Sequence, residues 1–90
     1  MPRIKLTVFG IVQGVGFRYH TRLKAIEIGL TGYVRNRPEG TVEIVADGDQ
    51  TQLQQIIQWA HQGSPAAQVD RVEVVDQLSI NRFESFVIDY

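Results

Sequence analysis

The 90-residue sequence predicts a single α+β domain, in which two helices pack on one face of one sheet. Two observations predict this class. Short segments that alternate apolar and polar residues, as half-buried strands do, flank two longer segments with apolar residues at helical spacing. A chain of this length buries only about 60–65% of its unfolded surface, so it has room for one thin core. Residues 1–90 are therefore expected to form one domain.

The first half of the chain is expected to form a strand, a helix and a second strand. Ile4 to Val8 alternate apolar and polar residues and predict the first strand. After a glycine-containing loop, apolar residues recur at helical spacing, at Tyr19, Leu23, Ile26 and Leu30. Gly29 occupies the place of a left-handed C-terminal cap, which ends this helix. Gly32 to Asn36 then predict the second strand.

The second half is expected to add a strand, a helix and two further strands. The turn from Arg37 to Gly40 leads into a third alternating segment, Thr41 to Ala46. Asp49 is placed to cap a second helix that runs through Gln62, with one apolar stripe formed by Leu53, Ile56, Ile57 and Ala60. Arg71 to Val75 predict a fourth strand, and a final short strand carries Phe86, Ile88 and Tyr90.

This order, β-α-β-β-α-β with a short terminal strand, is that of the split βαβ or ferredoxin-like sandwich. The expected sheet is mixed but mainly antiparallel, with both helices on one face. Each crossover through a helix joins parallel strands, so the first two strands point the same way and end at the same edge. Arg18 follows the first strand and Asn36 ends the second, so they should be neighbours there. The last strand should bring the Tyr90 carboxylate to that edge, where it would brace Arg18.

The composition excludes several classes of site. The chain has no cysteine, so disulfides, thiolate chemistry and cysteine-based zinc sites are excluded, and a cytoplasmic location is expected. The N-terminal segment MPRIKLTVF has no long apolar stretch, so neither a signal peptide nor a membrane span is expected. Asp47 to Asp49 lack the later ligands of a calcium loop and are interpreted as a turn and a helix cap.

Charge is distributed unevenly along the chain. The net charge is −1, yet residues 1–37 hold seven basic side chains against one acidic one, and residues 38–90 hold two basic against nine acidic ones. This asymmetry predicts that the N-terminal part forms the wall of an anion site. The alternative, that folding interleaves the two halves, stays open at this point.

The segment GIVQGVGFRYH, residues 10–20, predicts an anion cradle. The first amides of a helix have no acceptor within the helix, and the helix dipole makes that end electropositive. Glycines let consecutive amides converge as a concave nest, which suits phosphate oxygens. Arg18 adds a planar fork that can bind two phosphate oxygens. His20 is expected to face away from the cradle, and Gln13 to shape the loop without taking part in chemistry.

Two common phosphate loops do not match this segment. A P-loop requires a lysine followed by serine or threonine at fixed positions, and neither is present. A dinucleotide fingerprint requires a third glycine where this chain has Tyr19. A small phosphate group is therefore expected rather than a nucleotide, and no magnesium ligand is expected.

Two segments closely resemble the signatures of the acylphosphatase family, small hydrolases of the mixed anhydride between a carboxylate and phosphate. The first is Gly10 to Arg18, GIVQGVGFR, and the second is Gly32 to Asn36, GYVRN, followed by Gly40 to Glu43, GTVE. Both occur at the family's mutual spacing, and the resemblance covers the whole chain. Two departures are Glu39, where the family often has aspartate, and Arg37, which is less typical and could alter substrate preference.

The resemblance implies a site and a reaction. Arg18 matches the family's phosphate-binding arginine, and Asn36 matches the residue that orients the attacking water. The implied phosphate-binding loop consists of Gly14, Val15, Gly16, Phe17 and Arg18. The implied reaction is hydrolysis of a small-molecule acyl phosphate to a carboxylate and inorganic phosphate by in-line attack of water, with no metal and no cofactor. We expect a cytoplasmic monomer that binds neither nucleic acid nor membrane.

Three other functions share the predicted fold. An RNA-binding module needs aromatic residues on its central strands, and the segment TVEIVA has none. A non-catalytic phosphate- or metabolite-binding regulatory domain could keep the cradle without turnover, and an assay is needed to separate it from an enzyme. An acylphosphatase-like domain of a larger carbamoyl-transfer protein would bring cysteine motifs that this chain lacks, so a free-standing enzyme is expected. The physiological acyl group is not readable from the residues.

Overall fold

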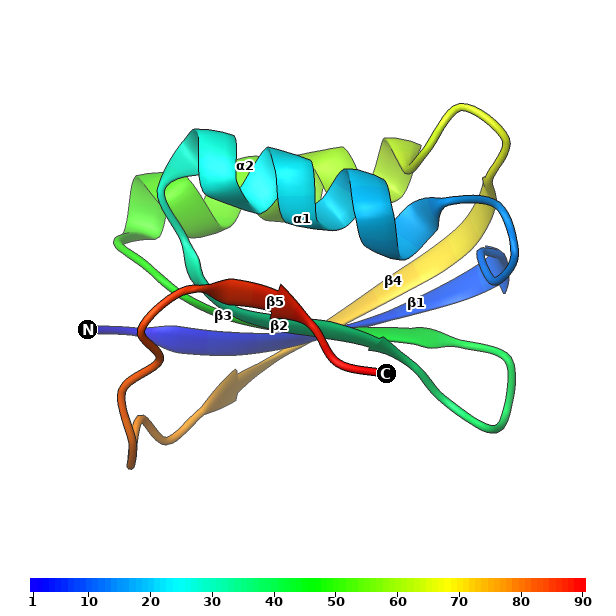
Figure 1. The fold of residues 1–90 in the computed structure, drawn as a ribbon. Helices are drawn as coiled ribbons and strands as arrows, with labels where there is room; N and C mark the ends of the chain where they lie inside the picture. The colour runs from blue at the N-terminus through cyan, green and yellow to red at the C-terminus, as the bar shows by residue number, and fades with distance from the viewer.

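The computed structural model describes residues 1–90 without a gap. Its elements in chain order are β1 (Arg3–Ile11), α1 (Phe17–Ile28), β2 (Thr31–Asn36), β3 (Val42–Asp47), α2 (Gln50–Gln62), β4 (Gln68–Gln77) and β5 (Phe86–Ile88). The predicted order of elements is confirmed. Both helices lie side by side over one face of the sheet, and no helix covers the other face (Figure 1). Neither helix is long and apolar enough to cross a membrane.

The five strands form one sheet in the order β4-β1-β3-β2-β5. β3 pairs antiparallel with both β1 and β2, so these two strands point the same way, as expected. β5 pairs parallel with β2, which makes the sheet mixed but mainly antiparallel. β1, β2 and β5 therefore end on the same side of the molecule. Figure 1 shows the start of α1, the β2–β3 turn and the C-terminus on that side.

The core lies between the sheet and the helices. Alternate residues of β1 and β3 are buried toward the helices, as the sequence pattern predicted, namely Ile4, Leu6, Val8, Val42, Ile44 and Ala46. The stripe of α2 packs on them through Leu53, Ile56 and Ala60, and Ile57 is half-buried. Each fully buried Val, Leu or Ile side chain stabilises a fold by about 1.5–3 kcal/mol. This layer therefore fixes which face of the sheet the helices cover.

The buried side of α1 is not the apolar row that revealed the helix in the sequence. Three members of that row are exposed to 57%, 45% and 51%, namely Tyr19, Leu23 and Ile26. The buried residues of the helix are Phe17, Thr21 and Ala25. Two of these are small, which allows a close approach to the sheet, and the Thr21 hydroxyl is satisfied because it donates to the Phe17 carbonyl at 2.8 Å. A row of apolar side chains therefore faces outward from α1.

Two strands are longer than the sequence pattern predicted. β1 continues to Ile11, and β4 spans Gln68–Gln77, with a bulge in their pairing just before Gly10. A Cβ atom at Gly10 would overlap the carbonyl oxygen of Gln68, so the glycine permits the close approach of the two strands. Gly10 therefore serves strand pairing, and only the two later glycines of the segment shape the loop before α1.

Candidate active site

A cavity of about 140 Å³ lies where β1, β2 and β5 end, beside the start of α1. Its lining consists of Val12, Gly14, Gly16, Phe17, Arg18, Tyr19, Asn36, Ile88 and Tyr90. The structure thus brings Arg18 of α1 and Asn36 of β2 to one cavity. Val15 belongs to the same loop, but its side chain packs against the core and does not line the cavity. A larger open hollow of about 450 Å³ between the helices is lined by side chains of α1 and α2 and reaches none of these residues.

The loop before α1 presents unpaired amides. Gly14 and Gly16 both have φ of 76°, in the left-handed region that favours glycine. Gly16 is the N-cap of α1, and no side chain caps this helix. The backbone N–H groups of residues 14–19 donate to no acceptor in the protein. They form an electropositive helix end with free donors, which suits the oxygens of a phosphate.

The second helix begins differently. The Gln52 amide donates to Asp49 Oδ1 at 2.8 Å, and the Asp49 amide donates to Gln52 Oε1 at 2.9 Å. This capping box satisfies donors at the start of α2, as the sequence predicted for Asp49. The uncapped start of α1 is therefore a local feature of the cavity and not a general property of this chain.

Arg18 is half-buried in the first turn of α1, and it lines the cavity. No carboxylate forms an ion pair with its guanidinium. The expected brace by the Tyr90 carboxylate is not formed; instead the Tyr90 ring lies against the guanidinium, with 5.1 Å from Cζ to the ring centroid. An aromatic ring attracts a cation without neutralising its charge. The charge of Arg18 therefore stays available to an anion in the cavity.

Asn36 contributes the polar atom that is buried in this cavity. In β2 it follows the alternation of the buried residues Gly32 and Val34, so its side chain is on the face that the helices cover. Its Oδ1 atom is buried and has no hydrogen-bond partner. Burial of an unsatisfied polar atom costs about 1–3 kcal/mol, and such atoms are rare unless a water or ligand pairs with them. The cavity therefore contains a buried oxygen, Asn36 Oδ1, that is free to accept a hydrogen bond from a water or a ligand.

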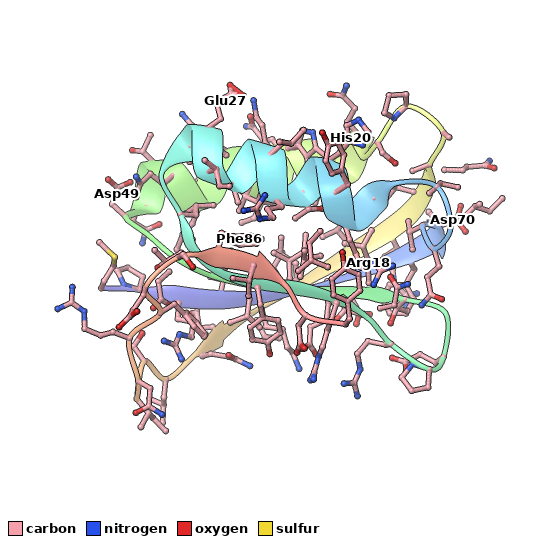
Figure 2. All side chains as sticks on the ribbon, in the orientation of Figure 1. Arg18, His20, Glu27, Asp49, Asp70 and Phe86 are labelled. Carbon is pink, nitrogen blue, oxygen red and sulfur yellow. The ribbon has the colours of Figure 1, made fainter.

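His20 is separate from this cavity, as the sequence predicted. Figure 2 shows Arg18 on the side of α1 toward the sheet and His20 on the side away from it. His20 Nδ1 lies 2.9 Å from the Gly16 carbonyl oxygen, and the residue borders another hollow together with Trp59. The cavity lining contains no His, Asp, Glu or Lys, and no three His, Cys, Asp or Glu side chains of the chain converge as metal ligands. The site can therefore bind and orient, but its side chains offer no base that works near neutral pH.

Two side chains hold the loop in place. Gln13 Nε2 donates to the carbonyl oxygens of Arg37 at 2.8 Å and of Thr41 at 2.9 Å, which ties the loop to the β2–β3 turn next to Asn36. The expected role of Gln13 in shaping the loop is consistent with these bonds. Ser64 Oγ donates to the Val15 carbonyl at 3.0 Å from the loop that follows α2. Sequence reasoning missed Ser64, because the segment SPAAQ shows only a loop. Arg37 contributes its backbone and does not line the cavity.

Replacing Gln13 by alanine should loosen the loop. Two hydrogen bonds are lost, and each typically contributes about 0.5–1.5 kcal/mol, so we expect the free energy of unfolding to fall by about 1–3 kcal/mol. Phosphate should also bind more weakly, because the open amides lose their fixed position. Urea unfolding and inhibition by inorganic phosphate measure the two effects. The matched control is Gln54→Ala on the exposed side of α2, and equal stability of the two variants would contradict the tie.

The opposite face of the sheet carries a charged cluster beside Asn36. Glu43 accepts hydrogen bonds from the Tyr33 hydroxyl at 3.0 Å and from Arg35 Nε at 2.9 Å. Burial raises the pKa of Tyr33, and the bond to Glu43 and its charge raise it further. Burial lowers the pKa of Arg35, but Glu43 outweighs this by charge and hydrogen bonding, so the pKa is raised overall. Tyr33 therefore stays neutral and Arg35 charged near neutral pH, and the cluster braces the β2–β3 pairing that places Asn36.

Comparisons with known proteins agree with this fold and identify the family. A family model described as Acylphosphatase matches residues 4–88. An acylphosphatase of Acaryochloris marina is 50% identical, over 98% of this chain and 97% of that protein. The crystal structure of acylphosphatase from Bacillus subtilis is similar over 100% of both chains, with a TM-score of 0.95 and 38% identity. The fold also matches 12% of the longer HypF chain of T. kodakarensis, with a TM-score of 0.88 and 31% identity. The chain therefore belongs to the acylphosphatase family, enzymes that hydrolyse the carboxyl–phosphate anhydride of acyl phosphates.

Proposed function

We propose that the cavity hydrolyses acyl phosphates by direct attack of water on phosphorus, with two side chains in different roles. Arg18 and the free amides of Gly14 to Phe17 bind the phosphoryl group, and Asn36 holds the attacking water. One observation carries the proposal: a buried, unpaired acceptor, Asn36 Oδ1, lies in the same cavity as a helix start with free donors. A phosphate accepts hydrogen bonds from the free amides, and a water donates one to Asn36 Oδ1.

Hydrolysis of an acyl phosphate mainly requires that the reacting groups are held in position and that the charge of the phosphoryl group is balanced. In the proposed step, a bond forms between the water oxygen and phosphorus while the bond from phosphorus to the carboxyl oxygen breaks. The carboxylate leaves with the electron pair of that bond. Catalysis of such a transfer comes mainly from fixing the phosphoryl group, balancing its charge and placing the nucleophile in line. The amides and Arg18 are suited to the first two tasks, because their donors are in place before the reaction begins.

The proton of the water also needs an acceptor. A carboxamide can accept a hydrogen bond from water and donate to it, but it is not a base near neutral pH. No side-chain carboxylate or imidazole lines the cavity. We therefore assign one proton of the water to a phosphoryl oxygen of the substrate, while the other stays on the attacking oxygen, so that dihydrogen phosphate and the carboxylate are the products of the step. No metal or cofactor takes part in any proposed step.

The test is hydrolysis of acetyl phosphate in H₂¹⁸O, followed by ³¹P NMR and mass spectrometry, with and without EDTA. We expect turnover at the same rate in both samples, with the label in phosphate and not in acetate. Label in acetate would show attack at the carbonyl carbon and contradict the step at phosphorus. Phosphate binding without any turnover would instead support the regulatory-domain alternative. A rate that EDTA abolishes and magnesium restores would contradict the metal-free mechanism.

A monomer in the cytoplasm is part of the same proposal. Residues of a single chain suffice to bring Arg18 and Asn36 to one cavity. The cysteine-free composition suits a reducing compartment. Light scattering after size exclusion should give the monomer mass of 10.2 kDa, and a stable larger species would contradict the monomer.

A further inference from the structure

We infer that Tyr19 and Tyr90 bind the acyl group of the substrate at the mouth of the cavity, so that the enzyme favours aromatic acyl phosphates over acetyl phosphate. The inference rests on the proposed function, because it assigns the half of the substrate that the phosphate cradle does not hold. Three features of the cavity carry it, namely the direction in which the cavity opens, the side chains at its open end and their exposure.

The cavity has a closed end and an open end. Asn36 Oδ1 is buried, which marks the closed end. Tyr19 and Tyr90 line the same cavity but are 57% and 94% exposed, which marks the open end. The start of α1 and the end of the chain after β5 both lie on this side of the molecule (Figure 1). A substrate therefore enters and leaves between the two tyrosines.

In-line displacement sets the direction of the leaving group. The attacking and leaving oxygens lie on opposite sides of phosphorus. If the water is held by Asn36 at the closed end, the carboxyl oxygen and its acyl group must point to the open end. The acyl group is then delivered to the rings of Tyr19 and Tyr90, with the half-buried Ile88 beside them.

Neither tyrosine ring packs in the core, and both are exposed to solvent. Tyr19 meets the His20 ring edge-on, with 5.3 Å between centroids, and one face of the Tyr90 ring lies against Arg18. Neither contact removes the rings from solvent, since 57% and 94% of these residues remain exposed. Aromatic groups attract each other through edge-to-face or offset contacts in addition to the area they bury. A benzoyl group can make such contacts with these rings, whereas the methyl of an acetyl group has no ring and buries less area.

The experiment compares kcat/KM for benzoyl phosphate and acetyl phosphate in the wild type and in Tyr19→Ala. We expect the ratio of the two constants to fall by about tenfold in the variant, since loss of an aromatic contact and its buried area is worth about that factor. Taking the ratio against the wild type removes the different chemical reactivity of the two substrates. The matched control is Leu23→Ala, which removes an exposed apolar side chain one turn further along α1 and outside the cavity. Its ratio should stay within twofold of the wild type.

Tyr90→Ala separates two roles of the second ring. If the ring binds the acyl group, the variant should lose more activity toward benzoyl than toward acetyl phosphate. An equal loss for both substrates would show that the ring only positions Arg18, and would overturn its part of the inference. Binding of phenacylphosphonate and acetonylphosphonate, which replace the bridging oxygen by carbon and cannot be hydrolysed, gives the same comparison by calorimetry without turnover.

The outcomes distinguish this inference from the proposed function. An unchanged ratio in Tyr19→Ala, with both substrates still hydrolysed, would overturn the aromatic acyl site and leave the proposed function standing. Failure of the wild type to hydrolyse either substrate would remove the proposed function and the inference together. A reduced ratio in Tyr19→Ala with the control unchanged, matched by weaker phenacylphosphonate binding, supports the inference.

Discussion

Arg18→Ala should lower kcat/KM for acyl phosphates by about 10³-fold or more and abolish inhibition by inorganic phosphate. The guanidinium has no carboxylate partner and lines the cavity, so its charge is free for the phosphoryl group. Arginines that stabilise a transferring phosphoryl group contribute about 10³–10⁵ in rate in other enzymes. Initial rates with acetyl phosphate, together with the inhibition constant of phosphate, measure both effects.

Two further variants sharpen this prediction. Arg18→Lys keeps the charge but loses the planar fork, so its activity should lie between the wild type and the alanine variant. Lys24→Ala removes a positive charge further along the same helix, outside the cavity, and is the control for long-range electrostatics. If Lys24→Ala loses as much activity as Arg18→Ala, the general field of α1 matters and the specific contact does not.

Asn36→Ala should lower kcat by about 10²–10³-fold while inorganic phosphate still binds with wild-type affinity. Removal of one preorganised hydrogen-bonding group from a catalytic site typically costs a factor of this size. The phosphate partners, Arg18 and the loop amides, are untouched by the change. The variant also removes a buried acceptor that has no partner, so the free energy of unfolding should stay within about 1 kcal/mol of the wild type.

This combination separates catalysis from structure. A residue with a purely structural role would lose stability together with activity, whereas Asn36→Ala should lose activity alone. The chain's other asparagine, Asn81, is exposed and distant from the cavity, and Asn81→Ala serves as the control. A parallel loss of phosphate affinity in Asn36→Ala would mean that the carboxamide binds phosphate and does not hold water.

The fold was readable because each strand and helix has a strong local pattern. Alternation identified the strands, and the capping residue Asp49 marked the start of α2 correctly. The orientation of α1 was not readable, because two rows of residues recur at helical spacing and the more apolar one, with Leu23 at its centre, faces outward. The buried row consists of Phe17 and the two small residues Thr21 and Ala25, and packing against the sheet decides between the two rows. Propensity alone contains no information about that packing.

The site was readable only in part. The spacing of the two signatures, together with the parallel direction of β1 and β2, placed Arg18 and Asn36 at one cavity. The unpaired state of Asn36 Oδ1 depends on every neighbouring atom and has no signal in the sequence. Ser64 reaches the cradle loop from a segment far along the chain, and the Tyr90 ring takes the place that its carboxylate was expected to occupy. These contacts follow from tertiary structure and not from a local pattern.

A crystal structure with inorganic phosphate bound tests the central claim most directly. We expect phosphate oxygens at about 2.7–3.2 Å from the amides of residues 14–18 and from the Arg18 guanidinium, with a water on Asn36 Oδ1. The phosphate should not displace the rings of Tyr19 and Tyr90 from the open end. Phosphate bound elsewhere with the cavity unchanged, or Asn36 bonded to phosphate with no water beside it, would contradict the division of roles between these two side chains.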